Sequence, residues 1–396
     1  MICIAGKNNI AVLATSYIKS KYPNLEIVAI VNKTDLGKNG FHLSFKKFCE
    51  LNHIKIVQLE DIYEIEDLMF LSLEFDRIIK PNKFKTKALF NIHFSLLPSF
   101  KGMYTSALPI IKNQKYSGVT LHKIDEGIDT GDIIDQISFE IGYETTSQEL
   151  YELYTKYGFK LLENNLDKLL NNNYQSKPQS SKDSSYYSKS EIDYSNLHID
   201  LNKTAEEIYN QIRAYSFPAY QLPKVKSYSI YHSKIFTEKS GGIPGRIISD
   251  DEFTLTLSTI DFDIILYKDR REDMFNAFRT NDLEFIQRLV VHNYPLQQRS
   301  KEGWDPLIIS AYNGHVNLVK YLIQEHNWDV NTQNNNKTSF AMYVMTHACL
   351  SGNFELLKYI KSNYKEIDWT HCDANGKDIF FYAKMYNNKK VLEILS

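Results

Sequence analysis

The sequence predicts an α/β fold followed by a small helix-plus-β subdomain and an α-helical repeat module. Strand-like and helix-like stretches alternate through the first part of the chain, short strands follow a polar stretch, and one helical pattern repeats near the C-terminus. The changes of pattern place domains at residues 1–190, 191–268 and 269–396.

The first domain reads as alternating strands and helices. The expected strands are residues 1–6, 26–32, 54–59, 75–81, 88–95 and 117–124. The expected helices are residues 7–22, 44–52, 105–114 and 147–172. This alternation is typical of a mostly parallel, Rossmann-like sheet with helices on both faces. Ligands of such sheets bind at the carboxyl ends of the strands.

A polar, Ser-rich stretch at residues 171–189 predicts a loop or linker. Thr204 and Glu207, three residues apart, then form a capping-box pattern that predicts a helix start. Glycine-punctuated strands complete the small β subdomain, at residues 225–236, 245–251, 253–259 and 262–268.

The C-terminal part repeats one helical pattern four times. Asn281, Gly314, Gly352 and Asn387 are equivalent positions, separated by 33, 38 and 35 residues. A period near 33 residues with paired helices is typical of ankyrin repeats. The copy at residues 303–323, "GWDPLIISAYNGHVNLVKYLI", resembles the ankyrin pattern most clearly, and we expect the outer copies to be caps.

Composition excludes several classes of protein. A net charge of −2 and a pI of about 6.6 give no global basic field for nucleic acid. The four cysteines form no CxxC pair, so neither a zinc knuckle nor a disulfide framework is indicated, and a reducing cytoplasmic location fits. We expect no signal peptide, and no membrane span because no apolar run approaches ~18 residues.

Two polar residues stand out in the apolar stretch "NIHFSLLP". Asn91 and His93 share one face of a strand, where burial is costly unless they bond to protein partners or face a substrate. A second stretch, "DEGIDTGDII" at residues 125–134, carries four carboxylates and two glycines, which allow close approach of backbone to a ligand.

In order and spacing, "NIHFSLLPSFKG" and "IDEGIDTGDII" resemble the N10-formyltetrahydrofolate-dependent formyltransferases, with 36 residues from His93 to Asp129. The resemblance covers residues 1–265 and implies N10-formyltetrahydrofolate as co-substrate, with no metal. It implies that Asn91 donates an N–H to the oxyanion and that His93 exchanges protons or, when charged, stabilises the oxyanion. Asp129 is then expected to orient His93 and to couple with its charge.

Further contacts are expected on both sides of this cluster. The folate is expected near Lys80 and Phe90 and the loop before Asp129, where Asp125 either contacts folate or stabilises its own loop. The loop that carries Lys7, Asn8 and Asn9 follows the first strand and opens a helix. It suits a phosphate of the acceptor, or it is a simple strand-to-helix turn.

The stretch "IRAYSFPAYQLP" at residues 212–223 resembles the nucleotide-receiving segment of sugar N-formyltransferases. Tyr220 then stacks on thymine or uracil, or packs with Phe217 in the subdomain. Arg213 pairs with phosphate or caps a neighbouring loop.

The domain makeup resembles that of a sugar N-formyltransferase with an ankyrin module, and this resemblance implies a dTDP-linked amino-dideoxysugar acceptor, foremost dTDP-3-amino-3,6-dideoxy-D-glucose, formylated for O-antigen or lipopolysaccharide. It also implies a homodimer. Three alternatives stay open: a 4-amino sugar nucleotide as acceptor, methionyl-tRNA as acceptor, or a catalytically silent ankyrin protein that binds a partner.

Trp304 is expected at the tip of an ankyrin hairpin, facing solvent. An exposed indole is a stacking platform for a flat base, and Arg270, Arg271 and Arg279 lie upstream, where they are able to meet phosphates. The hypothesis is a second nucleotide-sugar site on the repeats; the alternative is a surface for a protein partner.

Overall fold

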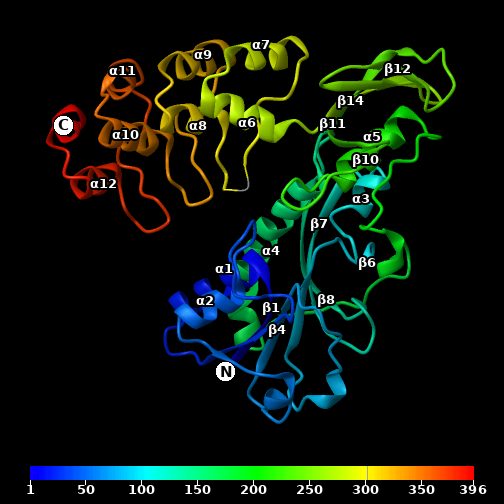
Figure 1. Cartoon of the computed structure of the whole chain (residues 1–396). Coiled ribbons are helices and arrows are strands. Elements are labelled where there is room, and N and C mark those ends of the chain that lie inside the picture. Colours follow the sequence, from blue (N-terminus) through cyan, green and yellow to red (C-terminus); the bar gives the residue numbers. More distant parts are fainter. Residues whose placement is uncertain (301) are drawn as a thin grey trace. The chain divides into compact units, whose positions relative to one another are not determined.

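The structure is a computed structural model that describes residues 1–300 and 302–396. The chain divides into two compact units, residues 1–249 with 256–266, and residues 250–255 with 267–396 (Figure 1). The first unit holds the α/β sheet, and the second holds the helical repeats.

A seven-stranded sheet forms the centre of the first unit, in the order β3-β2-β1-β4-β5-β7-β8. Its strands are β1 (Ile2–Gly6), β2 (Ile27–Val31), β3 (Lys55–Ile56), β4 (Met69–Leu73), β5 (Leu89–His93), β7 (Tyr116–Lys123) and β8 (Ile133–Glu140). The strands from β3 to β5 pair in parallel, and β7 and β8 continue the sheet antiparallel. The expected mostly parallel sheet is confirmed.

The long helices pack on one face of this sheet. Ile2 and Ile4 of β1 share a core with the helices α1 (Asn8–Lys21), α2 (Phe45–Leu51), α3 (Leu108–Ile111) and α4 (Ser147–Leu170). Figure 1 shows α1 and α4 close together. Cys3 and Ala5 face a second core, closed by the 3₁₀ turn η1 (Leu59–Ile62) and the segment around η2 (Pro81–Lys83). The expectation of helices on both faces is therefore wrong for the described residues.

The strand expected at residues 75–81 is also wrong. The strand at this place in the sheet is β4, whose residues are all buried. The later stretch carries Asp76 and Arg77, and Ile78 is 69% exposed. Because a central strand is covered on both faces, it needs a largely apolar run, which the earlier stretch offers with Ser72 as its one polar residue.

The small subdomain begins with α5 (Ala205–Tyr215), and the capping box of Thr204 and Glu207 at its start is confirmed. A five-stranded sheet follows in the order β10-β11-β14-β13-β12. Its strands are β10 (Lys224–Val225), β11 (Tyr228–Lys239), β12 (Ile247–Asp250), β13 (Thr254–Leu257) and β14 (Phe262–Lys268). Two short strands, β6 (Lys101–Gly102) and β9 (Tyr186–Tyr187), pair near the turn η3 (Lys189–Glu191).

The repeats form consecutive helix pairs. The helices are α6 (Arg271–Thr280), α7 (Leu283–Val291), α8 (Pro306–Tyr312), α9 (Val316–His326), α10 (Phe340–Ser351), α11 (Glu355–Asn363), α12 (Ile379–Met385) and α13 (Lys389–Leu395). Asn281, Gly314, Gly352 and Asn387 have φ of 61°, 74°, 71° and 52° at the turn inside each pair. The predicted repeat frame is confirmed, because its equivalent positions are those that adopt the left-handed conformation.

Among the described residues, no helix combines the length and the apolar character needed to cross a lipid bilayer.

Candidate active site

β5 brings Asn91 and His93 to the carboxyl end of the parallel strands. Phe90 and Ile92 of this strand belong to the core under the helices, so the two polar side chains project from the opposite face. Asn91 lies between Ser72 of β4 and His122 of β7 in the sheet register. The pair therefore lies where ligands of parallel α/β sheets bind.

Asp129 joins the two residues into one cluster. Its Oδ2 accepts a hydrogen bond of 2.9 Å from the backbone N–H of Gly102 and lies 3.5 Å from His93 Nδ1. Its Oδ1 accepts a bond of 3.3 Å from Asn91 Nδ2 and lies 3.6 Å from His122 Nε2. The three residues singled out in the sequence thus meet around one carboxylate, together with a second histidine.

The Asp129 carboxylate is ionised in this environment. Its side chain is only 13% exposed, and burial acts to raise the pKa of Asp129. The charge of His93 and the N–H of Gly102 outweigh burial and hold the pKa well below its usual value. A fixed negative charge therefore faces both imidazoles.

His93 is held by both of its ring nitrogens. Nε2 lies 2.8 Å from the carbonyl oxygen of Phe100, and since a carbonyl only accepts, Nε2 carries a hydrogen. Nδ1 faces the Asp129 carboxylate. Both ring nitrogens therefore face groups that accept hydrogen bonds, and these contacts fix the orientation of the ring.

The turn after β1 lies beside the end of β4. A Cβ on Gly6 would lie 2.0 Å from the carbonyl oxygen of Leu73, so only glycine permits this approach of the two strands. Asn8 follows with φ of 61°, and its Nδ2 donates to Glu74 Oε2 at 3.3 Å and to the Tyr151 hydroxyl at 3.2 Å. The N-cap residue of α1, Lys7, makes no capping hydrogen bond with its side chain, so it leaves the first N–H groups of the helix for another partner such as an anion.

An aromatic group lies on the same side of the unit. Tyr220 is 60% exposed, and its ring centre lies 5.2 Å from that of Phe217, 5.6 Å from His42 and 6.1 Å from Phe41. His42 in turn contacts Tyr151, with ring centres 4.8 Å apart. More than half of the Tyr220 surface thus stays exposed, and Tyr151 links this aromatic group to Asn8, so an aromatic surface is available for stacking of a flat base.

Comparison with known proteins identifies the family. The family described as "Formyl transferase" matches residues 67–166, and "Formyl transferase, C-terminal domain" matches residues 191–274. WlaRD, described as a sugar 3N-formyl transferase in the presence of dTDP and 5-N-formyl-THF, is 46% identical, with a TM-score of 0.63 over 68% of this chain and 97% of WlaRD. The chain belongs to the formyltransferase family. The family "Ankyrin repeats (3 copies)" matches residues 274–344.

Two further relatives are similar to this formyltransferase over different shares of its length. The N-formyltransferase from Helicobacter canadensis, in complex with folinic acid and dTDP-3-aminofucose, is 44% identical, with a TM-score of 0.63 over 67% of this chain and 98% of that one. The methionyl-tRNA formyltransferase of Clostridium beijerinckii is 33% identical over 180 residues, which are 45% of this chain and 57% of that protein. The chain thus spans little more than half the length of this curated relative.

Sequence reasoning missed His122. Its Nδ1 lies 2.7 Å from the carbonyl oxygen of Lys123 and therefore donates, which leaves Nε2 to accept from Asn91 Nδ2 at 3.0 Å. His122 is buried and fixes the amide of Asn91. The only signal in the sequence is a histidine in a strand just before the acidic loop, because the pairing of β7 with β5 is a tertiary feature.

Glu74 and Tyr151 of the formyltransferase were also missed. The Tyr151 hydroxyl donates to Glu74 Oε2 at 2.7 Å, and burial raises the pKa of the Glu74 carboxyl. Glu74 follows β4 with φ of 57°, one residue past the last partner of Ile92 in β5. It therefore lies beside His93 at the ends of the two strands, a placement that no local sequence pattern shows.

The folate-side candidates differ in what each is able to offer a ligand. Lys80 is exposed at the start of η2, and the Phe90 side chain is wholly buried, so only its backbone is able to meet a ligand. Asp125 Oδ1 accepts from the Gly127 N–H at 3.1 Å and from Thr130 Oγ1 at 2.7 Å. This is the loop-stabilising alternative for Asp125.

Two acceptor-side candidates are engaged within the protein. Arg213 is buried, and it donates to Asn210 Oδ1 at 2.9 Å and to the carbonyl oxygen of Thr145 at 3.1 Å. The structure favours the loop-capping alternative for Arg213 over a phosphate contact. Asn9 Oδ1 accepts from the Leu43 N–H at 2.8 Å and so ties the helix start to the loop that carries His42.

Trp304 is less exposed to solvent than expected. It is partly buried, and its ring centre lies 5.2 Å from Tyr312 and 4.7 Å from Tyr343. Two of the upstream arginines are paired with carboxylates, Arg270 with Asp273 at 2.6 Å and Arg271 with Asp269 at 2.7 Å. The repeats thus present an aromatic cluster rather than an isolated indole.

His42 makes the stability of the formyltransferase dependent on pH. Burial, and then the charge of Lys7, lower the pKa of His42 from 6.5 to about 4. Between these values the unfolded chain binds more protons, so stability is lost as pH falls from 6.5 towards 4. We expect the wild type to lose about 2 kcal/mol more than His42→Phe between pH 7 and pH 5, measured by urea unfolding. An equal loss in both proteins would contradict this assignment.

Proposed function

We propose that this formyltransferase moves the formyl group of N10-formyltetrahydrofolate onto the 3-amino group of a dTDP-linked 3-amino-3,6-dideoxyhexose, foremost dTDP-3-amino-3,6-dideoxy-D-glucose. The observation that carries the proposal is the 46% identity with the sugar 3N-formyl transferase WlaRD over 97% of its length. The ligand named for the Helicobacter canadensis relative, dTDP-3-aminofucose, also supports amino position 3.

In the proposed mechanism, the sugar amine attacks the formyl carbon and the formyl oxygen becomes an oxyanion. His93, oriented by Asp129, stabilises the oxyanion, gives a proton to the folate nitrogen as the bond from that nitrogen to the formyl carbon breaks, and takes up the proton that the amine loses. Asn91 Nδ2 lies between His122 and Asp129, so one of its hydrogens turns to the oxyanion as charge develops. Collapse of the intermediate releases tetrahydrofolate and the formamide.

The acceptor is proposed to bind at the carboxyl ends of β1 and β4. The diphosphate meets the uncapped start of α1 and Lys7, and the thymine stacks on the exposed ring of Tyr220. Asn8 and Asn9 hold this loop in place through their own hydrogen bonds. On the folate side, Lys80, Asp125 and the backbone of Phe90 stay proposals for the neighbourhood of the pterin.

The resemblance further supports a cytoplasmic homodimer that supplies a formylated deoxysugar for O-antigen. The small β subdomain is the proposed dimer interface, because it exposes Ile243, Ile248 and Ile260 at 76%, 52% and 58%. Sedimentation of the wild type and of Ile248→Asp tests this: a wild-type dimer that the substitution weakens is expected, and two monomers contradict it.

Methionyl-tRNA is the second candidate acceptor, because curated relatives carry that activity in their names. The net charge of −2 argues against it, since binding to tRNA depends on a basic surface. A catalytically silent ankyrin protein is a weaker alternative, because Asn91, His93 and Asp129 form an intact cluster.

A panel of acceptors tests the proposal. Turnover with N10-formyltetrahydrofolate is measured for dTDP-3-amino-3,6-dideoxy-D-glucose, its galacto epimer, a dTDP-4-amino sugar, UDP-4-amino-arabinose and initiator methionyl-tRNA. We expect kcat/KM for a 3-amino sugar to exceed that for the others by about tenfold or more, because an unpaired polar group in the site is costly. Preference for tRNA would overturn the proposal, and preference for a 4-amino sugar would correct the amino position.

A second nucleotide-sugar site at Trp304 is proposed separately. The cluster of Trp304, Tyr312 and Tyr343 supports it, since Tyr312 keeps 38% of its surface exposed. Calorimetry of dTDP-sugar with the full chain is expected to give two sites per chain in the wild type and one in Trp304→Ala. Two sites in both proteins, or one site in both, would leave the repeats as a surface for a protein partner.

A further inference from the structure

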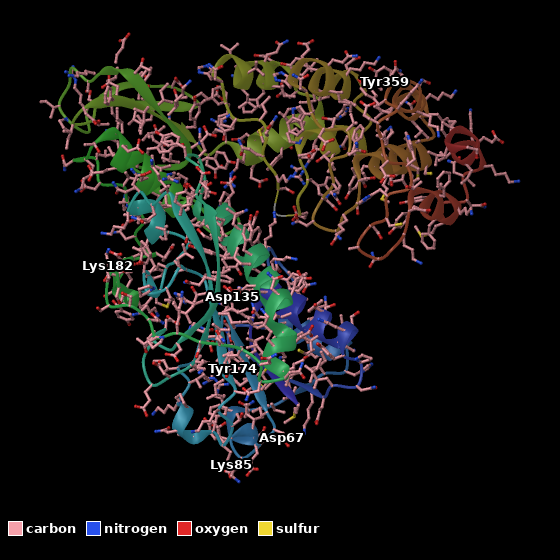
Figure 2. All side chains as sticks on the ribbon, turned by 180° about the vertical axis from the view of Figure 1, so that it is seen from behind. Asp67, Lys85, Asp135, Tyr174, Lys182 and Tyr359 are labelled. Carbon is pink, nitrogen blue, oxygen red and sulfur yellow. The ribbon has the colours of Figure 1, made fainter. Side chains whose placement is uncertain are left out.

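Residues 174–187 belong to the stretch 171–189 that was expected to be a linker. They form an extended segment that is fixed to two loops of the catalytic cluster, the loop around Phe100 and Gly102 and the acidic loop at residues 125–134. The labelled side chains of Tyr174 and Lys182 lie well apart in Figure 2, as expected of an extended stretch. At its C-terminal end, β9 pairs with β6, and the hydroxyl of Ser185 accepts from the Phe100 N–H at 2.8 Å. The rings of Phe100 and Tyr187 stack with centres 5.4 Å apart.

The first of these loops contacts the catalytic residues directly. The carbonyl oxygen of Phe100 is the partner of His93 Nε2, and the N–H of Gly102 donates to Asp129 Oδ2. The segment that holds this loop therefore acts on the positions of both His93 and Asp129.

The other end of the segment is fixed to the acidic loop. Lys177 and Ile133 exchange two backbone hydrogen bonds of 2.8 and 2.9 Å. Between these ends, Gln179 Nε2 donates to the carbonyl oxygens of Asp129 and of Gly131, both at 2.8 Å. Gln179 Oε1 is buried, with no partner among residues 1–300 and 302–396. Gln179 as a whole is partly buried, and its donors are both used while its buried acceptor is not, so the side chain is placed for its donors.

The acidic loop needs such support. Asp129 has φ of 54°, a left-handed conformation that is unfavourable for a residue with a side chain. At Gly131 a Cβ would lie 1.9 Å from the carbonyl oxygen of Lys123, so the loop approaches β7 as closely as a glycine permits. Strained backbone of this kind persists where the surroundings over-determine it.

We propose that Gln179 is a positioning residue for formyl transfer, which holds the Asp129 backbone in its left-handed conformation so that the carboxylate reaches His93, His122 and Asn91. The inference depends on the proposed catalytic role of Asp129. It does not depend on which acceptor is used, so the acceptor with the highest turnover in the panel serves for its test.

The test compares Gln179→Glu with Gln175→Glu. Gln179→Glu keeps the size of the side chain but replaces its N–H donor by an oxygen, which then faces two carbonyl oxygens. Gln175→Glu makes the same charge change at an exposed residue of the same segment. We expect Gln179→Glu to lower kcat by about 10²-fold with KM for both substrates unchanged, because a misplacement of about 1 Å has that effect. Gln175→Glu is expected to keep the wild-type kcat.

Two further variants separate positioning from folding. Gln179→Met keeps the length of the side chain without donors or charge, and a lower kcat at an unchanged melting temperature is expected. In the double variant Asp129→Asn/Gln179→Glu, we expect no slower turnover than in Asp129→Asn alone, since both changes act through one carboxylate. A wild-type kcat in both Gln179 variants, or a further loss in the double variant equal to that of Gln179→Glu, would overturn the proposal.

Discussion

Replacing His93 by Asn is expected to lower kcat for formyl transfer by about 10²–10⁴-fold, the usual contribution of a positioned acid–base group. Asn keeps a polar side chain on β5, but it has no charge to pair with Asp129 and no proton to exchange. KM for the nucleotide sugar is expected to stay near the wild-type value, because the proposed acceptor contacts lie on α1 and at Tyr220. Steady-state kinetics with both substrates varied checks the prediction.

His198→Asn is the matched control, since His198 is exposed and its backbone alone forms a β-bridge with Lys224. It is expected to keep the wild-type kcat. A loss of less than about tenfold in His93→Asn, or an equal loss in both variants, would rule out acid–base or electrostatic catalysis by His93.

Replacing Asp129 by Asn is expected to lower kcat by about 10²–10³-fold, as for loss of a preorganised electrostatic contact. The side chain keeps its size, but its charge, which faces His93 at 3.5 Å and His122 at 3.6 Å, is removed. Without that charge, the imidazolium of His93 loses its counter-ion in a largely buried place, so the transition-state oxyanion loses its partner.

Asp132→Asn controls for the charge of the same loop. Asp132 is 39% exposed, and its nearest partners are Lys123 at 3.9 Å and the hydroxyl of Ser176 at 3.2 Å. We expect nearly wild-type turnover from this variant. Should Asp132→Asn be the slow enzyme and Asp129→Asn the fast one, the catalytic carboxylate has been assigned to the wrong residue.

The sequence predicted those parts of the fold that depend on local pattern. The alternation of Asn91 and His93 in β5, the capping box of Thr204 and Glu207, and the helix-pair frame marked by Asn281 and Gly314 each depend on residues a few positions apart. These three predictions were correct because strand and helix periodicity determines such features, and tertiary contacts reinforce it.

Parts that depend on pairing between distant segments were not predicted. His122 joins the site because β7 runs antiparallel to β5 and sets it opposite Asn91. Gln179 lies in a polar, Ser-rich stretch of a composition typical of linkers, and its role comes only from two carbonyls some fifty residues earlier. Both side chains act through tertiary hydrogen bonds, which leave no periodic trace in the sequence.

Two further predictions were wrong, the strand at residues 75–81 and the exposure of Trp304. The stretch at 75–81 contains apolar residues but also Asp76 and Arg77, whereas the neighbouring run at 69–73 has Ser72 as its one polar residue and forms the central strand β4. Trp304 was expected to be exposed because a hairpin tip has few neighbours, yet Tyr312 and Tyr343 from two further helices cover part of its ring. Large aromatic side chains bury much surface when they pack. Trp304 therefore also packs against Tyr343 of α10, which the pattern of its own repeat does not show.

The central claim is that the cluster of Asn91, His93 and Asp129 transfers a formyl group to a sugar amine. Mass spectrometry of dTDP-3-amino-3,6-dideoxy-D-glucose, incubated with N10-formyltetrahydrofolate and either wild type or Asp129→Asn, tests it most directly. With the wild type, nearly all of the sugar nucleotide is expected to gain one formyl group on its amine. With the variant, almost none is expected to do so in the same time. An unmodified sugar with the wild type, or equal formylation by both proteins, would contradict it.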